Sequence, residues 1–323
     1  RKPWNTIDKV RHVGRDGQLH YYSSKPPLFP TLVAGFYKLV NVATGMTLTE
    51  QPIYVARIVL ALVNLPMLAI FLFATVGSVH RICDDDWTRR FAAASCCFGT
   101  MVLPFAISLN NHLPAATATA LTMWVYLRAV DKAGVSDDAE SQSVSFWTWL
   151  TAGIAASFAA ANELPALSMT VFWFILFGWL NRKSIVPFTV GSLIVAAGFF
   201  GTNWIAHHSL RPPYAHRGNG DLIAELSLES VDTDESIQQI RKALVDQSVL
   251  PADASLSVQP SNEADRWVVM AGQQPFALLK RATAWHLTFW DDWYDYPGTY
   301  WRDGTRRGVD LGEPSRLVYL FHM

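Results

Sequence analysis

Cysteine is scarce in this chain of 323 residues, which contains only Cys83, Cys96 and Cys97. Adjacent cysteines rarely bridge each other and no C-x-x-C spacing occurs, so the sequence indicates neither a disulfide framework nor a cysteine-based metal site. Charged residues make up only 16% of the chain and the net charge is −1, so the overall charge indicates no nucleic-acid partner. P-loop, G-x-G-x-x-G, H-E-x-x-H and G-x-S-x-G motifs are also absent.

Long apolar runs are what the chain has in quantity. A helix that crosses a membrane needs about 20 apolar residues, and about six runs approach or reach this length. They are 53–79, 91–109, 113–130, 146–161, 164–180 and 185–207. The run 28–42 is shorter and contains Lys38, so we expect it to lie at the membrane interface. Buried helices of a large globular protein are the alternative, but six such runs are many for one core.

These runs predict a mostly α protein, a polytopic transmembrane helix bundle with a C-terminal outer-face α+β domain. Residues 1–52 form a first outer loop with an interfacial helix, 53–207 the bundle of about six helices, and 208–323 an outer-face soluble region. The chain begins with Arg1, and an apolar run at 317–323 stops abruptly. We therefore expect the sequence to be cut at both ends.

The charges of the loops predict an orientation. Loops rich in Lys and Arg alternate with the short loops 110–112 and 162–163, which have none. The basic residues are Arg81, Arg89, Arg90, Arg128, Lys132, Arg182 and Lys183. Because basic loops stay in the cytoplasm, residues 1–26, the short loops and 208–323 are expected on the outer face of a cytoplasmic (inner) membrane.

The region 208–323 contains too many large aromatic residues for a disordered linker. Helical spacing over 235–247 predicts a helix with Asp234 as its cap. The segments 267–271 and 276–290 resemble a strand pair, although a helix over 276–290 remains an alternative. We therefore expect a folded domain that contains both helix and strand.

The stretch 290–301 is dense in aromatic and acidic residues, including Trp290, Asp291 and Trp293. Rings stack on the C–H faces of sugars, and carboxylates accept hydrogen bonds from sugar hydroxyls. This composition therefore favours a sugar-binding surface, and Tyr22 is added to the expected substrate contacts. The alternative is an aromatic belt at the membrane surface.

Lys25 stands in an unusual turn just before the run 28–42. The two prolines after it, Pro26 and Pro27, impose an extended turn and prevent helix before Pro27. A lysine fixed at the membrane surface is well placed to meet a lipid phosphate. The alternative is a lysine that merely extends to the interface.

The pattern N-x-L-P-A occurs twice, at 111–115 and 162–166, and each copy joins two apolar runs. Helix capping explains the shared Asn and Pro, but it does not explain His112 and Glu163. Ionisable groups at membrane depth are functional candidates, so we expect both to line one polar cavity. Such a pair could bind a divalent cation or transfer a proton, whereas the alternative is two solvated turn residues.

Two arginines are further candidates for binding phosphate. Arg57 is a lone charge near the start of an apolar run, and Arg211 follows the last run. Arginine binds phosphate in a bidentate manner, which makes it the better ligand. The acidic cluster 84–86 stands beside Arg89 and is better explained as a solvated charge run.

The segment 22–28 reads Y-S-S-K-P-P-L, and here the chain resembles the GT-C glycosyltransferases, in particular the protein O-mannosyltransferase and aminoarabinose transferase group. Members of this group have a K-P-P-L motif, an interfacial helix and then a span with an arginine near its outer end. Lys25, the run 28–42 and Arg57 follow this order. The resemblance extends over the layout of about residues 15–130.

The resemblance implies a membrane enzyme that transfers a sugar from a polyprenyl-phosphate donor to an acceptor on the outer face. It also implies that Lys25 and Arg57 contact the lipid phosphate. In the family an acidic residue upstream of the motif is the general base. Asp8 and Asp16 are the only acids before Lys25, and neither stands in the family's Asp-Glu setting. We therefore expect a first span and the catalytic acid to precede Arg1.

The expected partners are a polyprenyl-phosphate sugar and the lipid bilayer. Two other functions are compatible with the sequence. A transporter or flippase would place paired polar groups near the middle of the bilayer. A membrane-anchored carbohydrate-binding protein without catalysis would explain the aromatic residues, but it would leave the K-P-P-L and N-x-L-P-A patterns unexplained.

Overall fold

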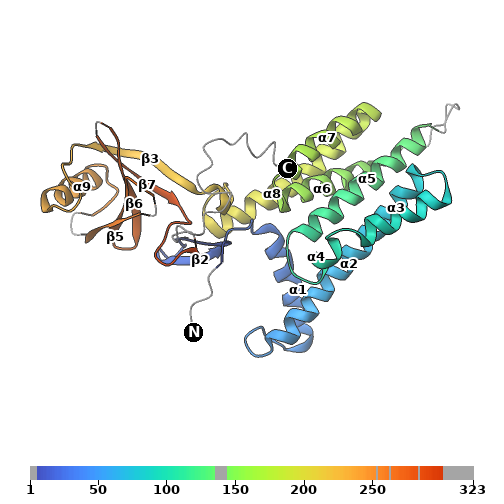
Figure 1. Ribbon diagram of the computed structural model, residues 1–323, viewed down its shortest axis with the longest axis horizontal. Coiled ribbons are helices and arrows are strands. Elements are labelled where there is room, and N and C mark those ends of the chain that lie inside the picture. Colours follow the sequence, from blue (N-terminus) through green and yellow to red (C-terminus); the bar gives the residue numbers. More distant parts are fainter. Residues whose placement is uncertain (1–5, 135–143, 252–253, 262, 283, 301–323) are drawn as a thin grey trace. The chain divides into compact units, whose positions relative to one another are not determined.

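The computed structural model describes residues 6–134, 144–251, 254–261, 263–282 and 284–300 (Figure 1). Trp301 and the apolar run 317–323 lie outside these residues. The chain divides into two compact units: residues 1–25 join 207–323 in the first, and residues 26–206 form the second. The N-terminal segment therefore folds together with the C-terminal region.

Two antiparallel sheets form the first unit in the described part of the chain. Strands β1 (Lys9–Val13) and β2 (Leu19–Ser23) form a hairpin in which Lys9 pairs with Ser23. The second sheet has the order β3-β7-β6-β5-β4. Its strands are β3 (Arg217–Leu226), β4 (Leu256–Pro260), β5 (Arg266–Ala271), β6 (Gln274–Lys280) and β7 (Trp285–Asp292). The predicted strand pair is therefore part of a larger sheet, and 276–290 contains two strands rather than one.

Helix α9 (Asp234–Asp246) packs on the five-stranded sheet (Figure 1). Its apolar residues Ile240 and Leu244 are fully buried against residues of β5, β6 and β7. The cap is Thr233, whose hydroxyl accepts a hydrogen bond from the Ser236 N–H, rather than Asp234 as the sequence suggested. Asp234 lies one position later, in the first turn, where a negative charge favours the helix dipole.

Helices form the second unit. In chain order they are α1 (Leu28–Thr44), α2 (Pro52–Ile82), α3 (Asp86–Phe98), α4 (Val102–Ala106), α5 (His112–Gly134), α6 (Phe146–Asn162), α7 (Ala166–Leu180), η1 (Arg182–Ser184) and α8 (Ile185–His207). Helix α1 packs on α2, and α2, α5, α6 and α7 contact one another in that order. The last residue of α8, His207, belongs to the first unit.

The prediction of a polytopic transmembrane bundle of about six helices is wrong. Among the described residues, only Pro52–Ile82 and Arg182–His207 are long and apolar enough to cross a membrane, and a five-stranded sheet accompanies them. Helices α6 and α7 have 17 and 15 residues. At about 1.5 Å per residue they fall short of the roughly 30 Å of a bilayer core. Helix α5 is longer but ends in charged residues.

The expected span 91–109 is interrupted for a local reason. Helix α3 ends at Phe98, and α4 begins only at Val102. Gly99 is a poor helix former, and Pro104 lies in the first turn of α4. A continuous helix would bring the Pro104 ring against the carbonyl of Thr100, so the chain breaks between the two segments.

Helices α6 and α8 approach closely at two glycines. A Cβ atom on Gly153 would overlap the Phe188 carbonyl oxygen, and one on Gly191 would overlap the Leu150 carbonyl oxygen. Only hydrogen at both positions allows this backbone contact. The second unit is thus fixed by small residues as well as by large apolar ones.

Candidate functional site

Four rings in the first unit stack in series. Tyr22 of β2 stacks on His12 of β1 with centroids 4.3 Å apart, and His12 stacks on Trp293 at 3.9 Å. The other side of Trp293 lies flat on His216, with centroids 3.6 Å apart and planes 2° apart. His207 meets His12 edge-on at 5.1 Å. Three histidines, His12, His207 and His216, therefore surround Trp293. These three histidines and Trp293 are all buried.

Backbone hydrogen bonds hold this stack together. The Arg11 N–H donates to the Trp293 carbonyl at 2.8 Å, and the Trp293 N–H donates to the His216 carbonyl at 3.0 Å. Asp292 stabilises the turn that contains Trp293, because its Oδ1 accepts from the N–H groups of Tyr294 and Asp295. The stack is thus part of the folded framework of the unit.

A buried ion pair supports the same turn. Arg266 donates to the other oxygen of Asp292 at 2.8 Å, and the Arg266 side chain is only 1% exposed. Its guanidinium also lies 4.4 Å from the centroid of the Trp290 ring. Burial raises the pKa of Asp292, whereas the Arg266 charge opposes this rise. The predicted substrate contact Trp290 therefore packs against a structural arginine.

Hydrogen bonds define the protonation of His12. Its Nδ1 lies 2.9 Å from the Val13 carbonyl, which can only accept, so Nδ1 holds the hydrogen. Its Nε2 then accepts from Nδ1 of His207 at 3.0 Å. The pKa of His12 is lowered from 6.5 to about 4, mainly by burial and to a smaller extent by the neighbouring His216, against the raising effect of the Val13 hydrogen bond. His12 is therefore neutral at physiological pH.

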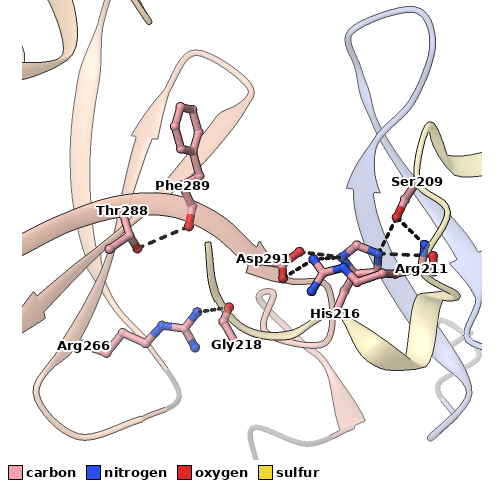
Figure 2. Close-up of polar contacts among 8 residues, drawn as sticks. All are labelled: Ser209, Arg211, His216, Gly218, Arg266, Thr288, Phe289 and Asp291. Carbon is pink, nitrogen blue, oxygen red and sulfur yellow. Dashed lines mark hydrogen bonds and ion pairs between the residues drawn. The ribbon is translucent and has the colours of Figure 1, made fainter. Parts of the chain in front are cut away.

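Polar groups meet at the His216 end of the stack (Figure 2). His216 Nδ1 lies 2.5 Å from Asp291 Oδ1, and its Nε2 lies 3.0 Å from the hydroxyl of Ser209. Arg211 donates to the second oxygen of Asp291 at 2.6 Å. Burial would raise the pKa of Asp291, but the hydrogen bonds from His216 and Arg211 outweigh it, so the pKa lies below its ordinary value. Asp291 is therefore ionised, and Arg211, predicted to bind a lipid phosphate, is paired with it.

An open groove of about 470 Å³ adjoins this network. Its lining includes Arg211, Asn219, Asp221, Trp290 and Asp291. The lining combines hydrogen-bond donors, acceptors and an aromatic ring, a composition that suits a hydroxyl-rich ligand. Of the predicted substrate contacts, the structure places Trp290 and Asp291 at this groove and Tyr22 and Trp293 in the ring stack. The sequence reasoning missed His12 and His207, since no local pattern connects residues so far apart.

The two acidic candidates of the N-terminal segment lie at opposite ends of the hairpin. Asp8 accepts a hydrogen bond from the Ser24 hydroxyl at 3.1 Å and lies 3.6 Å from Lys25 Nζ. Asp16 stands at the turn, where it pairs with His20 at 2.8 Å. The hydrogen bond from His20 lowers the pKa of Asp16. Asp8 is therefore next to the predicted phosphate-binding lysine, whereas Asp16 is not.

In the second unit the two N-x-L-P-A turns contact each other. His112 Nδ1 lies 2.6 Å from Glu163 Oε1, and both side chains are partly exposed. The Asn111 amide donates to the same carboxylate oxygen at 2.5 Å and to the Asn162 carbonyl at 2.8 Å. The repeated pattern thus brings its two variable residues together.

Arg57 borders an apolar groove in the same unit. The groove has a volume of about 460 Å³ and lies between α1 and α2. It is lined by Pro30, Val33, Ala34, Tyr37, Leu48, Ala56, Arg57, Val59, Leu60 and Leu109. Arg57 is exposed and is the one charged residue of this lining. No ion pair or hydrogen bond of its side chain occurs within the described residues.

The described residues contain no group of three or more His, Cys, Asp or Glu side chains that could hold a metal ion. The pair His112 and Glu163 would therefore supply two ligands at most to the divalent cation that the sequence suggested.

No family model matches this chain, and neither the curated proteins nor the solved structures gave a match. The function must accordingly be argued from the geometry of these sites.

Proposed function

We propose that this protein is a membrane-associated glycosyltransferase that takes a sugar from a polyprenyl-phosphate donor. The observation that carries the proposal is the groove between α1 and α2, which combines an apolar lining with the single cation Arg57. A polyprenyl phosphate has the same two parts, a long apolar chain and one anionic head. The groove would hold the first isoprene units while Arg57 binds the phosphate.

The surface of the second unit favours contact with lipid. Large apolar side chains are exposed along its helices to an extent that is unusual for a protein surrounded by water. Examples are Ile53 at 63%, Leu65 at 63%, Phe73 at 64%, Trp179 at 84%, Val186 at 67% and Ile205 at 61%. A lipid-linked donor would reach the groove sideways from such an environment.

The chemistry requires a cation on the donor side. As the glycosidic bond breaks, negative charge grows on the lipid phosphate that leaves. An arginine beside it stabilises that charge, and more strongly where water is scarce. Because the guanidinium of Arg57 has no partner among the described residues, it can bind an anion without first breaking an ion pair.

On the acceptor side a carboxylate must remove a proton. Glu163, which contacts His112, is our candidate, because it belongs to the same unit as Arg57.

A transfer assay with a labelled polyprenyl-phosphate sugar and the full chain tests the proposal. A charged hydrogen bond is worth about 1.5–3 kcal/mol, so Arg57→Ala should weaken donor binding about 10- to 100-fold. Arg57→Lys keeps the charge but loses the bidentate contact, and it should recover only part of the loss. Lys38→Ala is the matched control, because Lys38 is an exposed cation of α1 outside the groove lining. Equal binding by Arg57→Ala and Lys38→Ala would contradict the phosphate role.

A further inference from the structure

Ser209, His216 and Asp291 make contacts in the order of a serine–histidine–aspartate triad (Figure 2). They come from the segment after α8, the turn after η2 (Pro213–Ala215), and the end of β7. We propose that Ser209 is a nucleophile that attacks acyl esters, with His216 as its general base and Asp291 as the residue that orients His216. This activity is separate from the sugar transfer proposed above.

The hydrogen-bond chemistry assigns the tautomer that such a base needs. An ionised carboxylate can only accept, so the 2.5 Å contact with Asp291 places the hydrogen of the neutral imidazole on Nδ1. Nε2 then accepts from the Ser209 hydroxyl, which lies 3.0 Å away, while the Arg211 carbonyl is a longer contact of Nε2 at 3.4 Å. The Arg211 guanidinium lies 3.3 Å from Nδ1, but a donor cannot bond a nitrogen that already holds a hydrogen.

The local backbone presents the serine at a sharp turn. His208 has a positive φ of 53°, a left-handed conformation that is costly for a residue with a side chain. This conformation ends α8 and turns the chain directly before Ser209. The Arg211 N–H then donates to the serine oxygen at 3.0 Å. Ser209 is partly exposed, whereas His216 is only 4% exposed, so the nucleophile is accessible and its base is protected from water.

Trp293 and Arg211 complete the arrangement. Trp293 lies flat on the imidazole of His216, which fixes the plane of the ring and favours the imidazolium that forms during reaction. Arg211 holds the second oxygen of Asp291 and keeps this carboxylate in place. The groove that borders Arg211 and Asp291 also has Asn219, Asp221 and Trp290 in its lining, which suits the hydroxyl groups of a leaving alcohol. We therefore expect an acylated sugar or a similar polyol ester as the substrate.

The proposed reaction balances without a cofactor. The Ser209 oxygen forms a bond to the acyl carbon while its proton moves to Nε2 of His216. The ester C–O bond breaks, and the leaving alcohol takes that proton. Water then attacks the acyl-serine and gives a proton to Nε2 of His216. The bond between the acyl carbon and the serine oxygen breaks, His216 returns the proton to that oxygen, and the carboxylic acid leaves.

A fluorophosphonate probe on the full chain tests the proposal, because it labels activated serines and needs no lipid donor. We expect the label on Ser209, with none on Ser209→Ala. Ser261 is the matched control, since its hydroxyl contacts the carboxylate of Asp295 at 2.5 Å without a described histidine contact, and it should stay unlabelled. Asp291→Asn should slow the labelling of Ser209 by about 10³- to 10⁴-fold, as expected for loss of the orienting carboxylate.

Hydrolysis of p-nitrophenyl acetate provides the second readout, and it should be lost in Ser209→Ala. Circular dichroism of each variant separates loss of reactivity from loss of the fold. A folded wild-type chain that shows no label on Ser209, or labels Ser209 and Ser261 equally, would overturn the proposal. Such a failure would leave the sugar-transfer proposal untouched, because the probe does not report on the lipid donor.

Discussion

The buried neutral His12 should make the first unit sensitive to mild acid. Its pKa is lowered from 6.5 to about 4 because burial disfavours the charged ring. In the unfolded chain His12 takes up a proton as the pH falls below 6.5, while in the folded chain it stays neutral down to about pH 4. The contribution of neutral His12 to stability is therefore fully present above the pKa of the unfolded chain, 6.5. It is lost as the pH falls toward the pKa of the folded chain, about 4.

The size of this effect follows from the pKa shift. Each pKa unit corresponds to about 1.4 kcal/mol, so the loss of stability approaches about 3 kcal/mol below both values. Between pH 7 and pH 5 the expected loss is about 2 kcal/mol, because the unfolded chain is then almost fully protonated at His12. This is a large fraction of the stability of a small domain.

Amide hydrogen exchange of peptides from 9–23 in the full chain measures this loss locally, after correction for the intrinsic pH dependence of exchange. We expect the free energy of opening of the hairpin to be about 2 kcal/mol lower at pH 5 than at pH 7. In His12→Gln, which removes one titrating ring, the difference should become smaller, and the part that remains comes from His207, whose pKa burial also lowers to about 4. An unchanged opening energy in the wild-type chain would show that His12 titrates as an exposed histidine, which would refute this reasoning.

Two further changes test the framework of each unit. Arg266→Met should destabilise the first unit by about 3–5 kcal/mol, because it leaves Asp292 buried without its partner. Urea unfolding of the full chain measures this loss. A change below about 1 kcal/mol would show that the ion pair is dispensable. Gly153→Val should destabilise the second unit by about 1–3 kcal/mol, because the valine side chain would collide with the Phe188 carbonyl. A thermal shift assay should show a lower Tm for this variant than for the control Gly201→Val, since the position of Gly201 has open space around it.

Local sequence patterns predicted several elements well. The helical spacing over 235–247 corresponds to α9, and the run 28–42 corresponds to α1. These predictions succeed because the apolar period and the flanking residues act within one helix. The two turns of one repeated pattern bring His112 and Glu163 into contact, whereas the polar cavity expected around them stays a prediction.

Apolar composition alone could not predict the architecture. The run 276–290 contains the end of one strand, a turn and another strand, because the chain reverses at Arg281, whose N–H bonds the Ala284 carbonyl. The number of spans was overestimated because Gly99 and Pro104 interrupt one run and because α6 and α7 have only 17 and 15 residues. Hydrophobicity averaged along the chain does not register such local breaks.

The ring stack and the triad were beyond local patterns. His12 and His207 are 195 positions apart, and only the association of the N-terminal hairpin with the C-terminal region brings them together. Ser209 has no motif around it, since its partners come from other turns and strands. Sites assembled from distant segments can be recognised only after the fold is known.

Photo-cross-linking with a diazirine-bearing polyprenyl phosphate tests the central claim most directly. If the groove between α1 and α2 binds the donor, adducts should concentrate on peptides that contain Tyr37 and Leu60. Excess unlabelled polyprenyl phosphate should remove these adducts, and Arg57→Ala should reduce their amount. Adducts spread evenly over the exposed apolar helices, without competition and without an effect of Arg57→Ala, would contradict the claim that this groove recognises a lipid phosphate.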